Sequence, residues 1–100
     1  MSYRYILYPD AQEEYESSVL WYLNRSHRAA ENFVLAIENT LQLICENPTR
    51  WRNEYKNFYE LGVKKFPCTI IYTIEEDQQL IFVSGIHHTK RNPKKKYRKK

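Results

Sequence analysis

The sequence of 100 residues contains only two glycines, Gly62 and Gly85, and only two cysteines, Cys45 and Cys68. Two isolated glycines exclude the glycine-rich loops that cradle phosphates in nucleotide-binding proteins. Two distant cysteines and three histidines do not have the spacing of a zinc site or a redox motif. We therefore expect no metal, no cofactor, and two buried thiols that stay reduced inside the cell.

Long apolar runs are also lacking. No segment approaches the ~20 apolar residues that a membrane-spanning helix needs, and the N-terminal stretch has no signal-peptide cleavage site. These features predict a cytoplasmic protein with no membrane partner. The length predicts one domain with a core of modest size. The 42% apolar and 15% aromatic content favours a folded chain over a disordered one.

Acidic side chains are missing from the C-terminal segment. Residues 90–100 carry eight of the sixteen basic side chains and none of the twelve acidic ones, so this segment has a charge of +8. The rest of the chain is slightly acidic. Such asymmetry is typical of a protein with an anionic partner, although a solvated chain end is the structural alternative. We expect one domain over residues 1–88 and a basic tail over residues 89–100.

Two amphipathic helices are predicted after a short first strand. Residues 3–8 are rich in aromatic side chains and end at Pro9, which is typical of a strand followed by a turn. Asp10 is the expected N-cap of the first helix, with Glu13 completing a capping box, and this helix should end at residues 24–26. Its apolar stripe consists of Ala11, Tyr15, Val19 and Tyr22.

The second helix is expected to begin at Ser26, whose hydroxyl can serve as the N-cap. It should end before Asn47-Pro48, because a residue that precedes proline disfavours helical angles. Two helices joined so closely form an antiparallel hairpin, and neither can bury its stripe without a partner surface. The stripe of the second helix consists of Ala30, Phe33, Ile37, Leu41 and Ile44.

The second half of the chain contains most of the β-branched residues and predicts three strands. Residues 58–65 form the first strand, and residues 68–74 alternate as in a half-buried strand. Residues 80–86 are almost continuously apolar, as in a strand covered on both faces. Residues 49–57 are expected to be a polar connection, in which Trp51 either folds back on the core or stacks on a partner.

The order strand-helix-helix-strand-strand-strand predicts an α+β domain. The antiparallel helical hairpin should pack on one face of an antiparallel sheet of three to four strands. The N-terminal strand should pair either at an edge of this sheet or beside the last strand.

Basic side chains gather at the ends of the predicted strands. Lys64 and Lys65 precede Pro67, and His87 and His88 follow the last strand. Metal-free RNA cleavage needs a base, an acid and cations that stabilise the phosphorane, and His, Lys, Arg and Tyr can fill these roles. The same residue types suit plain nucleic-acid binding. The structural alternative is that period-two alternation turns one histidine inward, as a hydrogen-bonded core residue, and the other outward.

Two motifs occur in the second half of the chain. The first is Phe66-Pro67-Cys68-x-Ile70-x-Tyr72-x-Ile74, and the second is His88-x-x-Arg91-x-Pro93. Together with Trp21-Tyr22 in the first helix and Ala29-Ala30 in the second, they resemble the toxins of the RelE/ParE superfamily from bacterial type II toxin–antitoxin systems. The resemblance covers nearly the whole chain. It implies a compact α+β fold, a growth-inhibiting toxin associated with plasmid stabilisation, and a cognate antitoxin that wraps around it.

The resemblance implies two alternative activities. ParE-like toxins inhibit DNA gyrase by binding it, whereas RelE-like toxins are metal-independent endonucleases that cut messenger RNA on the ribosome. The Phe-Pro core and the Arg-x-Pro ending favour the ParE-like activity, although Lys96-Tyr97 stands where many ParE-like sequences have a tryptophan. A nucleic-acid-binding module without toxicity is a third hypothesis, and a homodimer is left open.

Each activity implies its own site residues. In an endonuclease, His88 or Tyr97 would exchange protons, while Lys65 and Arg91 would stabilise charge. Contacts with a target protein or nucleic acid are expected from Lys64, His87, Lys90, Lys94 and Arg98.

Overall fold

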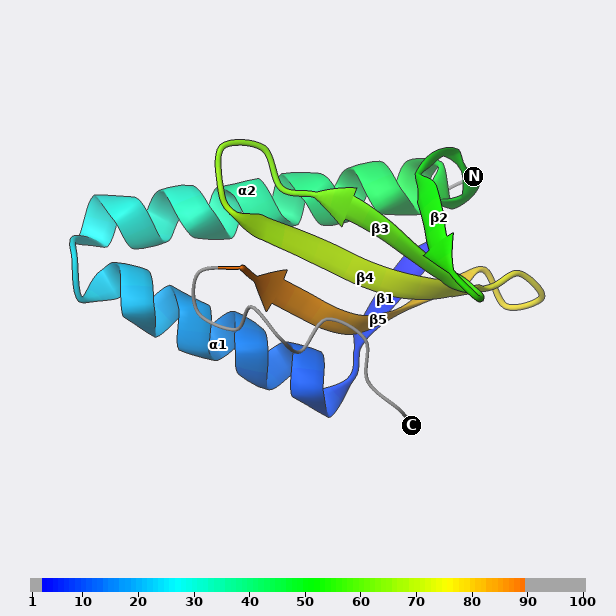
Figure 1. The fold of residues 1–100 in the computed structure, drawn as a ribbon, viewed down its shortest axis with the longest axis horizontal. Helices are drawn as coiled ribbons and strands as arrows, with labels where there is room; N and C mark the ends of the chain where they lie inside the picture. The colour runs from blue at the N-terminus through cyan, green and yellow to red at the C-terminus, as the bar shows by residue number, and fades with distance from the viewer. Residues whose placement is uncertain (1–2, 90–100) are drawn as a thin grey trace.

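Two helices, one short 3-10 helix and five strands occur in residues 3–89, the part of the chain that the computed structural model describes (Figure 1). The helices are α1 (Pro9–Leu23), α2 (His27–Glu46) and the 3-10 helix η1 (Pro48–Arg50). The strands are β1 (Arg4–Leu7), β2 (Arg52–Tyr55), β3 (Phe58–Gly62), β4 (Cys68–Glu75) and β5 (Leu80–His88).

The strands form one mixed sheet in the order β1-β5-β4-β3-β2. Strand β1 pairs parallel with β5, so the N-terminal strand lies both at an edge and beside the last strand. The other neighbours are antiparallel. The predicted α+β class is therefore confirmed. The prediction of three to four antiparallel strands is wrong, since the sheet has five strands and one parallel pair.

The additional strand is β2, which lies in the segment that was expected to be a polar connection. The side-chain amide of Asn53 donates hydrogen bonds of 3.1 Å to the backbone carbonyls of Lys56 and Phe58. Lys56 adopts a positive φ of 53° at the turn. These features close a hairpin that pairs β2 with β3. In the same segment Trp51 packs against the core, as one of the two alternatives predicted.

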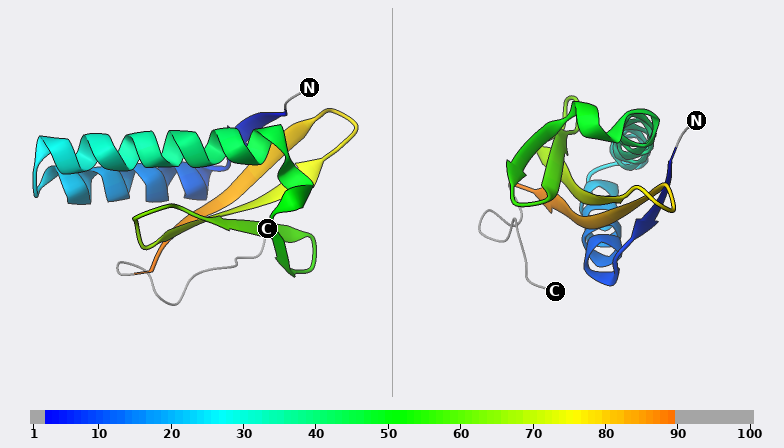
Figure 2. Two further views of the ribbon diagram at one scale, coloured as in Figure 1. Left: turned by 90° about the horizontal axis from the view of Figure 1, so that it is seen from above. Right: turned by 90° about the vertical axis from the view of Figure 1, so that its right-hand side faces the viewer.

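The two helices form an antiparallel hairpin that covers one face of the sheet (Figure 2). Residues of both helices share one core with strands β4 and β5. The stripe of α2 is confirmed, because Ala30, Phe33, Ile37, Leu41 and Ile44 are all buried. Tyr72 is the largest fully buried side chain among residues 3–89, and its hydroxyl donates a 2.6 Å hydrogen bond to the carbonyl of Pro48. Cys45 and Cys68 are buried thiols that are not joined in a disulfide.

The helix ends follow local chemistry. The prediction of Asp10 as N-cap of α1 is wrong, since the helix begins at Pro9 with Tyr8 as N-cap and no side-chain cap. Proline is favoured at the first helical position because its fixed φ already suits a helix. In α2 the prediction is confirmed: the hydroxyl of Ser26 accepts a 3.0 Å hydrogen bond from the amide of Ala29.

Neither described helix combines the length and the apolar composition that crossing a lipid bilayer requires.

Candidate functional site

The turn between β3 and β4, residues 63–67, displays two cations and is called the lysine turn below. Lys64 and Lys65 are exposed, whereas Val63 is buried. The amide of Val63 donates to the carbonyl of Cys68 at 2.8 Å. The amide of Phe66 donates to the carbonyl of Val63 at 3.2 Å, and Lys65 has a positive φ of 71°. The backbone is therefore tied tightly while both lysine side chains project from it.

The end of β5 lies against the lysine turn. His88 pairs with Cys68, the first residue of β4. Beyond it, the amide and the hydroxyl of Thr89 donate to the carbonyl of Pro67 at 2.9 Å and 3.2 Å. The structure thus brings the exposed Lys64 and Lys65 to the point from which the chain continues into its basic segment.

The two histidines at the end of β5 are both buried, with 4% of His87 and 3% of His88 exposed. The expectation of one inward and one outward histidine is therefore wrong. Consecutive residues of a strand face opposite sides of a sheet, so the burial of both shows that both faces are covered at this end of β5. His88 lies on the helix-covered side, where its Nε2 and the hydroxyl of Tyr22 are 2.8 Å apart.

An aromatic cluster surrounds this hydrogen bond. The ring of Tyr22 is stacked on Phe33 with centroids 4.8 Å apart, and it meets Phe66 edge-on at 5.4 Å. The ring centroids of Trp21 and His88 are 5.3 Å apart. The guanidinium of Arg25 lies 3.7 Å from the centroid of the Trp21 ring. Burial raises the pKa of the Tyr22 hydroxyl above its ordinary value. The cluster joins both helices to the lysine turn.

Glu14 provides a second connection between α1 and β5. Strand β1 pairs with β5 only as far as Val83, which leaves the following edge of β5 without a strand neighbour on that side. There the carboxylate of Glu14 accepts a 2.9 Å hydrogen bond from the amide of Ile86. Beyond the end of the β1–β5 pairing, helix α1 therefore supplies a hydrogen-bond acceptor for the edge of β5.

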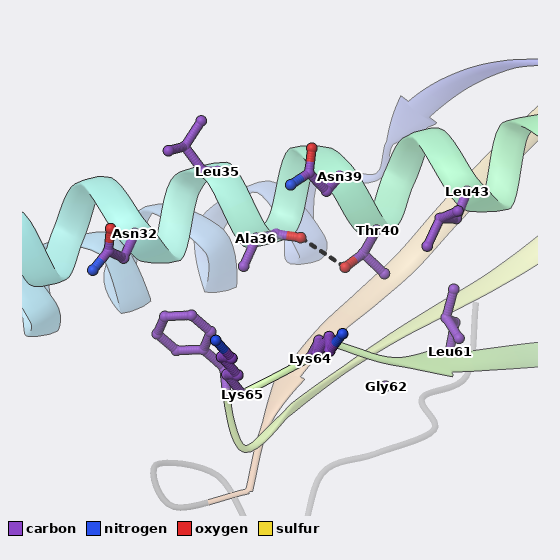
Figure 3. Close-up of a pocket in the computed structure, with 11 residues that line it drawn as sticks. Asn32, Leu35, Ala36, Asn39, Thr40, Leu43, Leu61, Gly62, Lys64 and Lys65 are labelled. Atoms are coloured by element: carbon purple, nitrogen blue, oxygen red, sulfur yellow. Dashed lines mark hydrogen bonds between the residues drawn. The ribbon is translucent and has the colours of Figure 1, made fainter.

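A groove of about 690 Å³ runs between α2 and the segment formed by β3 and the lysine turn (Figure 3). It is called the α2–β3 groove below. In Figure 3, Leu43 of α2 and Leu61 of β3 point toward one another across it. The hydroxyl of Thr40 donates to the carbonyl of Ala36 at 2.7 Å, so this polar group is satisfied within the helix. The other lining residues are Asn32, Leu35, Asn39, Gly62, Lys64, Lys65 and Phe66.

Large apolar side chains of the α2–β3 groove are exposed to solvent. Leu35 is 56% exposed and Leu43 is 48% exposed. They lie eight residues apart, beside the buried stripe of α2, and this spacing is visible in the sequence. The groove itself was not predicted, because it depends on how the lysine turn packs against α2.

The structure brings together only some of the residues predicted for the site. Lys64, Lys65, His87 and His88 gather at one end of the sheet, the lysines exposed and the histidines buried. The other predicted site residues lie outside the described residues and stay predictions; they are Lys90, Arg91, Lys94, Tyr97 and Arg98. Within residues 3–89, no three His, Cys, Asp or Glu side chains are arranged to hold a metal ion.

Comparison with solved structures shows the same fold in two proteins. A chromosomal ParDE toxin–antitoxin system from P. aeruginosa aligns with a TM-score of 0.73 at 11% identity, covering 87% of this chain and 96% of that chain. A mutant of the E. coli toxin RelE in its free state, in which two arginines are replaced by alanine, aligns with a TM-score of 0.62 at 12% identity. The alignment covers 93% of this chain and 90% of that chain. No curated protein matches in sequence.

A family model of the ParE toxin of the type II toxin–antitoxin system, parDE, matches residues 5–93. The match spans both helices, strands β2 to β5 and β1 from Tyr5 on, and it includes the aromatic cluster and the lysine turn. With the motifs and the fold in agreement, the chain belongs to the ParE toxin family of type II toxin–antitoxin systems.

Proposed function

We propose that this ParE-type toxin inhibits growth by acting on DNA gyrase and is neutralised by its cognate antitoxin. The family match over residues 5–93 carries this proposal. The toxin would act in the cytoplasm, where gyrase works on DNA. In this role it is an inhibitor that binds its target, and its chemistry is recognition rather than bond cleavage.

We place the target contacts at the lysine turn and in the basic tail. Lys64 and Lys65 are exposed cations on a turn held by backbone hydrogen bonds. They lie where the chain leaves β5 toward a segment that carries eight positive charges. The positive charge of both segments suits an acidic protein face or DNA held by the target. His87 is buried, so direct contacts are assigned to the lysines.

A gyrase supercoiling assay with purified toxin tests this function. We expect loss of supercoiling or accumulation of cleaved DNA complexes with the wild-type chain. A Lys64→Glu, Lys65→Glu double variant should need a markedly higher concentration for the same effect, because the positive surface becomes negative. Lys56→Glu is the matched control, since Lys56 is also an exposed lysine on a hairpin turn. Undisturbed supercoiling at saturating wild-type toxin would contradict gyrase as the target.

A ribosome-dependent endonuclease of the RelE type is the second candidate function. The exposed Lys64 and Lys65 favour it, because cations stabilise the charged phosphorane of RNA cleavage. The burial of His88 speaks against it as a proton-transfer residue, since such a group must reach the substrate. Primer extension on messenger RNA from induced cells distinguishes the two functions: codon-positioned cuts that are lost in Lys65→Ala would replace the gyrase proposal.

A further inference from the structure

A hollow lies where strand β1 meets the two helices, and it is called the β1–helix hollow below. Its volume is about 400 Å³, which is within the range of sites for small organic ligands. Ile37 and Leu41 line it and are only 1% and 3% exposed, so its floor is apolar. The hollow shares no lining residue with the α2–β3 groove. The other lining residues are Tyr5 and Leu7 of β1, Gln12 and Tyr15 of α1, and Glu38 of α2.

Polar groups from three elements meet at the hollow. Burial raises the pKa of the Tyr15 hydroxyl, and the negative charge of Glu38 and the hydroxyl of Tyr5 raise it further. Since electrostatic effects weaken with distance, Tyr15 lies near both of these groups. The side-chain amide nitrogen of Gln12 donates a 2.9 Å hydrogen bond to Glu16, which leaves the amide oxygen as an acceptor. The hollow therefore combines oxygen acceptors with two aromatic rings.

The charge of the hollow favours a cation. Glu38 is an exposed carboxylate, and no Lys, Arg or His is among the described residues that line the hollow. The faces of aromatic rings also attract cations. One carboxylate supplies too few oxygen ligands for a metal ion, whereas the buried aliphatic floor suits a hydrocarbon chain. An organic cation with an alkyl chain uses all of these features.

A second hollow continues along β1 and α2. Its volume is about 450 Å³, and it shares Tyr5, Glu38 and Leu41 with the first. It adds a second exposed carboxylate, Glu46, which follows Glu38 by eight residues, or roughly 12 Å along the helix axis. Two carboxylates at the ends of one partly apolar path match a linear molecule with a cation at each end. Arg4 also lines the second hollow, and its charge opposes a cation there.

We propose that the β1–helix hollow binds a linear aliphatic polyamine. One ammonium group lies at Glu38, the alkyl chain covers Leu41, and a second ammonium group reaches Glu46. The ligand contacts β1 and both helices, so its binding stabilises the packing of the edge strand on the helical hairpin. No residue of the lysine turn lines either hollow, and the site is therefore independent of the proposed target contacts.

NMR titration of the full-length toxin with octamethylenediamine tests the site, with thermal melting as a second readout. We expect saturable binding with a dissociation constant on the order of 1 mM, because exposed ion pairs are individually weak. Amide shifts should change at the residues that line the two hollows, and the melting temperature should rise. Magnesium chloride at equal ionic strength is the control, since it brings positive charge without an alkyl chain and should not shift these amides.

Ligand length tests the second carboxylate. Putrescine carries the same charge as octamethylenediamine on a shorter chain, so it does not span the distance from Glu38 to Glu46. It should therefore bind the wild-type toxin about threefold more weakly. In Glu46→Gln the two diamines should bind alike.

Substitutions at exposed positions test the first carboxylate. Glu38→Gln should weaken binding of octamethylenediamine about threefold or more, and Arg4→Ala should strengthen it, because a repelling charge is lost. Glu31→Gln is the matched control: Glu31 is an exposed glutamate of α2 outside both hollows, and binding should not change. Melting of each variant without ligand checks the fold.

The inference is overturned if octamethylenediamine does not saturate, if magnesium chloride produces the same amide shifts, or if Glu38→Gln binds like wild type. An equal loss in Glu31→Gln would show diffuse attraction to an acidic surface and overturns it as well. Equal binding of the two diamines by the wild-type toxin overturns the role of Glu46. These results leave the proposed function intact, because the gyrase assay tests that function separately.

Discussion

The hydroxyl of Tyr22 and the Nε2 atom of His88 are 2.8 Å apart, which joins helix α1 to the last residue of β5 across 66 positions of the sequence. The hydrogen bond lies between Trp21, Phe33 and Phe66, whose rings exclude water from it. Both partners belong to the motifs by which the sequence resembles its family. In the structure this bond fixes the C-terminal end of β5 against helix α1.

Removal of the Tyr22 hydroxyl should destabilise the protein. Tyr22→Phe keeps the stacked ring but leaves a buried nitrogen of His88 without this partner, which costs about 1–3 kcal/mol of the free energy of unfolding. Urea denaturation measures the change. Tyr5→Phe is the control, because Tyr5 is an exposed tyrosine at the sheet edge and should behave as wild type. Equal stability of both variants would show that the bond contributes nothing.

The edge of β5 should open more often when Glu14 loses its charge. Glu14→Gln replaces a charge-assisted hydrogen bond to the amide of Ile86 by a weaker neutral one. Hydrogen exchange followed by NMR should then show several-fold faster exchange at Ile86, with little change in the centre of β4. The exposed neighbour Glu13→Gln is the control. An unchanged exchange rate at Ile86 would exclude α1 as the partner of this edge.

Cys68 should make stability fall at alkaline pH. Burial, with a further contribution from the negative charge of Glu14, raises the pKa of the Cys68 thiol from 9.0 to about 12. Between these values the unfolded chain loses the proton first, so the folded state binds more protons and the free energy of unfolding decreases as pH rises. Cys68→Ala should flatten this dependence in melts across that range. A slope as steep as that of wild type would contradict the assignment.

The same burial makes the thiol unreactive in the folded protein. Since the thiolate is the nucleophile, alkylation of Cys68 at about pH 8 should be slow until the chain unfolds. Cys45 is also buried, and burial raises its pKa as well. Both sites should react quickly in guanidinium chloride, which serves as the reference. Rapid labelling of Cys68 under native conditions would show that this part of the core opens readily.

The N-cap of α2 offers a test that is independent of the site. Ser26→Ala removes the hydroxyl that accepts from the amide of Ala29, and should cost about 1 kcal/mol of stability. Ser26→Asp restores an acceptor and should recover most of the loss in thermal melts. If both variants melt alike, the cap does not contribute to stability.

Strong periodicity explains what could be predicted from the sequence. The apolar stripe of α2 repeats at helical spacing over five positions, and Pro48 ends the helix, so both its buried face and its end were predictable. Strand β2 was not predictable, because Arg52–Tyr55 contains no β-branched residue and pairs through the hairpin that Asn53 closes.

The candidate site was predictable only in part. The position of Lys64 and Lys65 at a sheet end beside Pro67 was predicted, but the strand expected over residues 58–65 ends at Gly62, so both lysines lie in a turn. The burial of both histidines could not be predicted from alternation, because the two side chains face opposite sides of the sheet and each side is covered by tertiary packing. The α2–β3 groove and the bond between Tyr22 and His88 are tertiary features, for which single-sequence patterns carry no signal.

The parallel pairing of β1 with β5 has a consequence for biosynthesis. Arg4 pairs with Leu80, so β1 can join the sheet only after β5 has been synthesised. Contacts of such long sequence separation form slowly, because the intervening chain loses entropy when its ends are brought together. A nascent or prematurely terminated chain therefore lacks both the closed sheet and the lysine turn in its final setting.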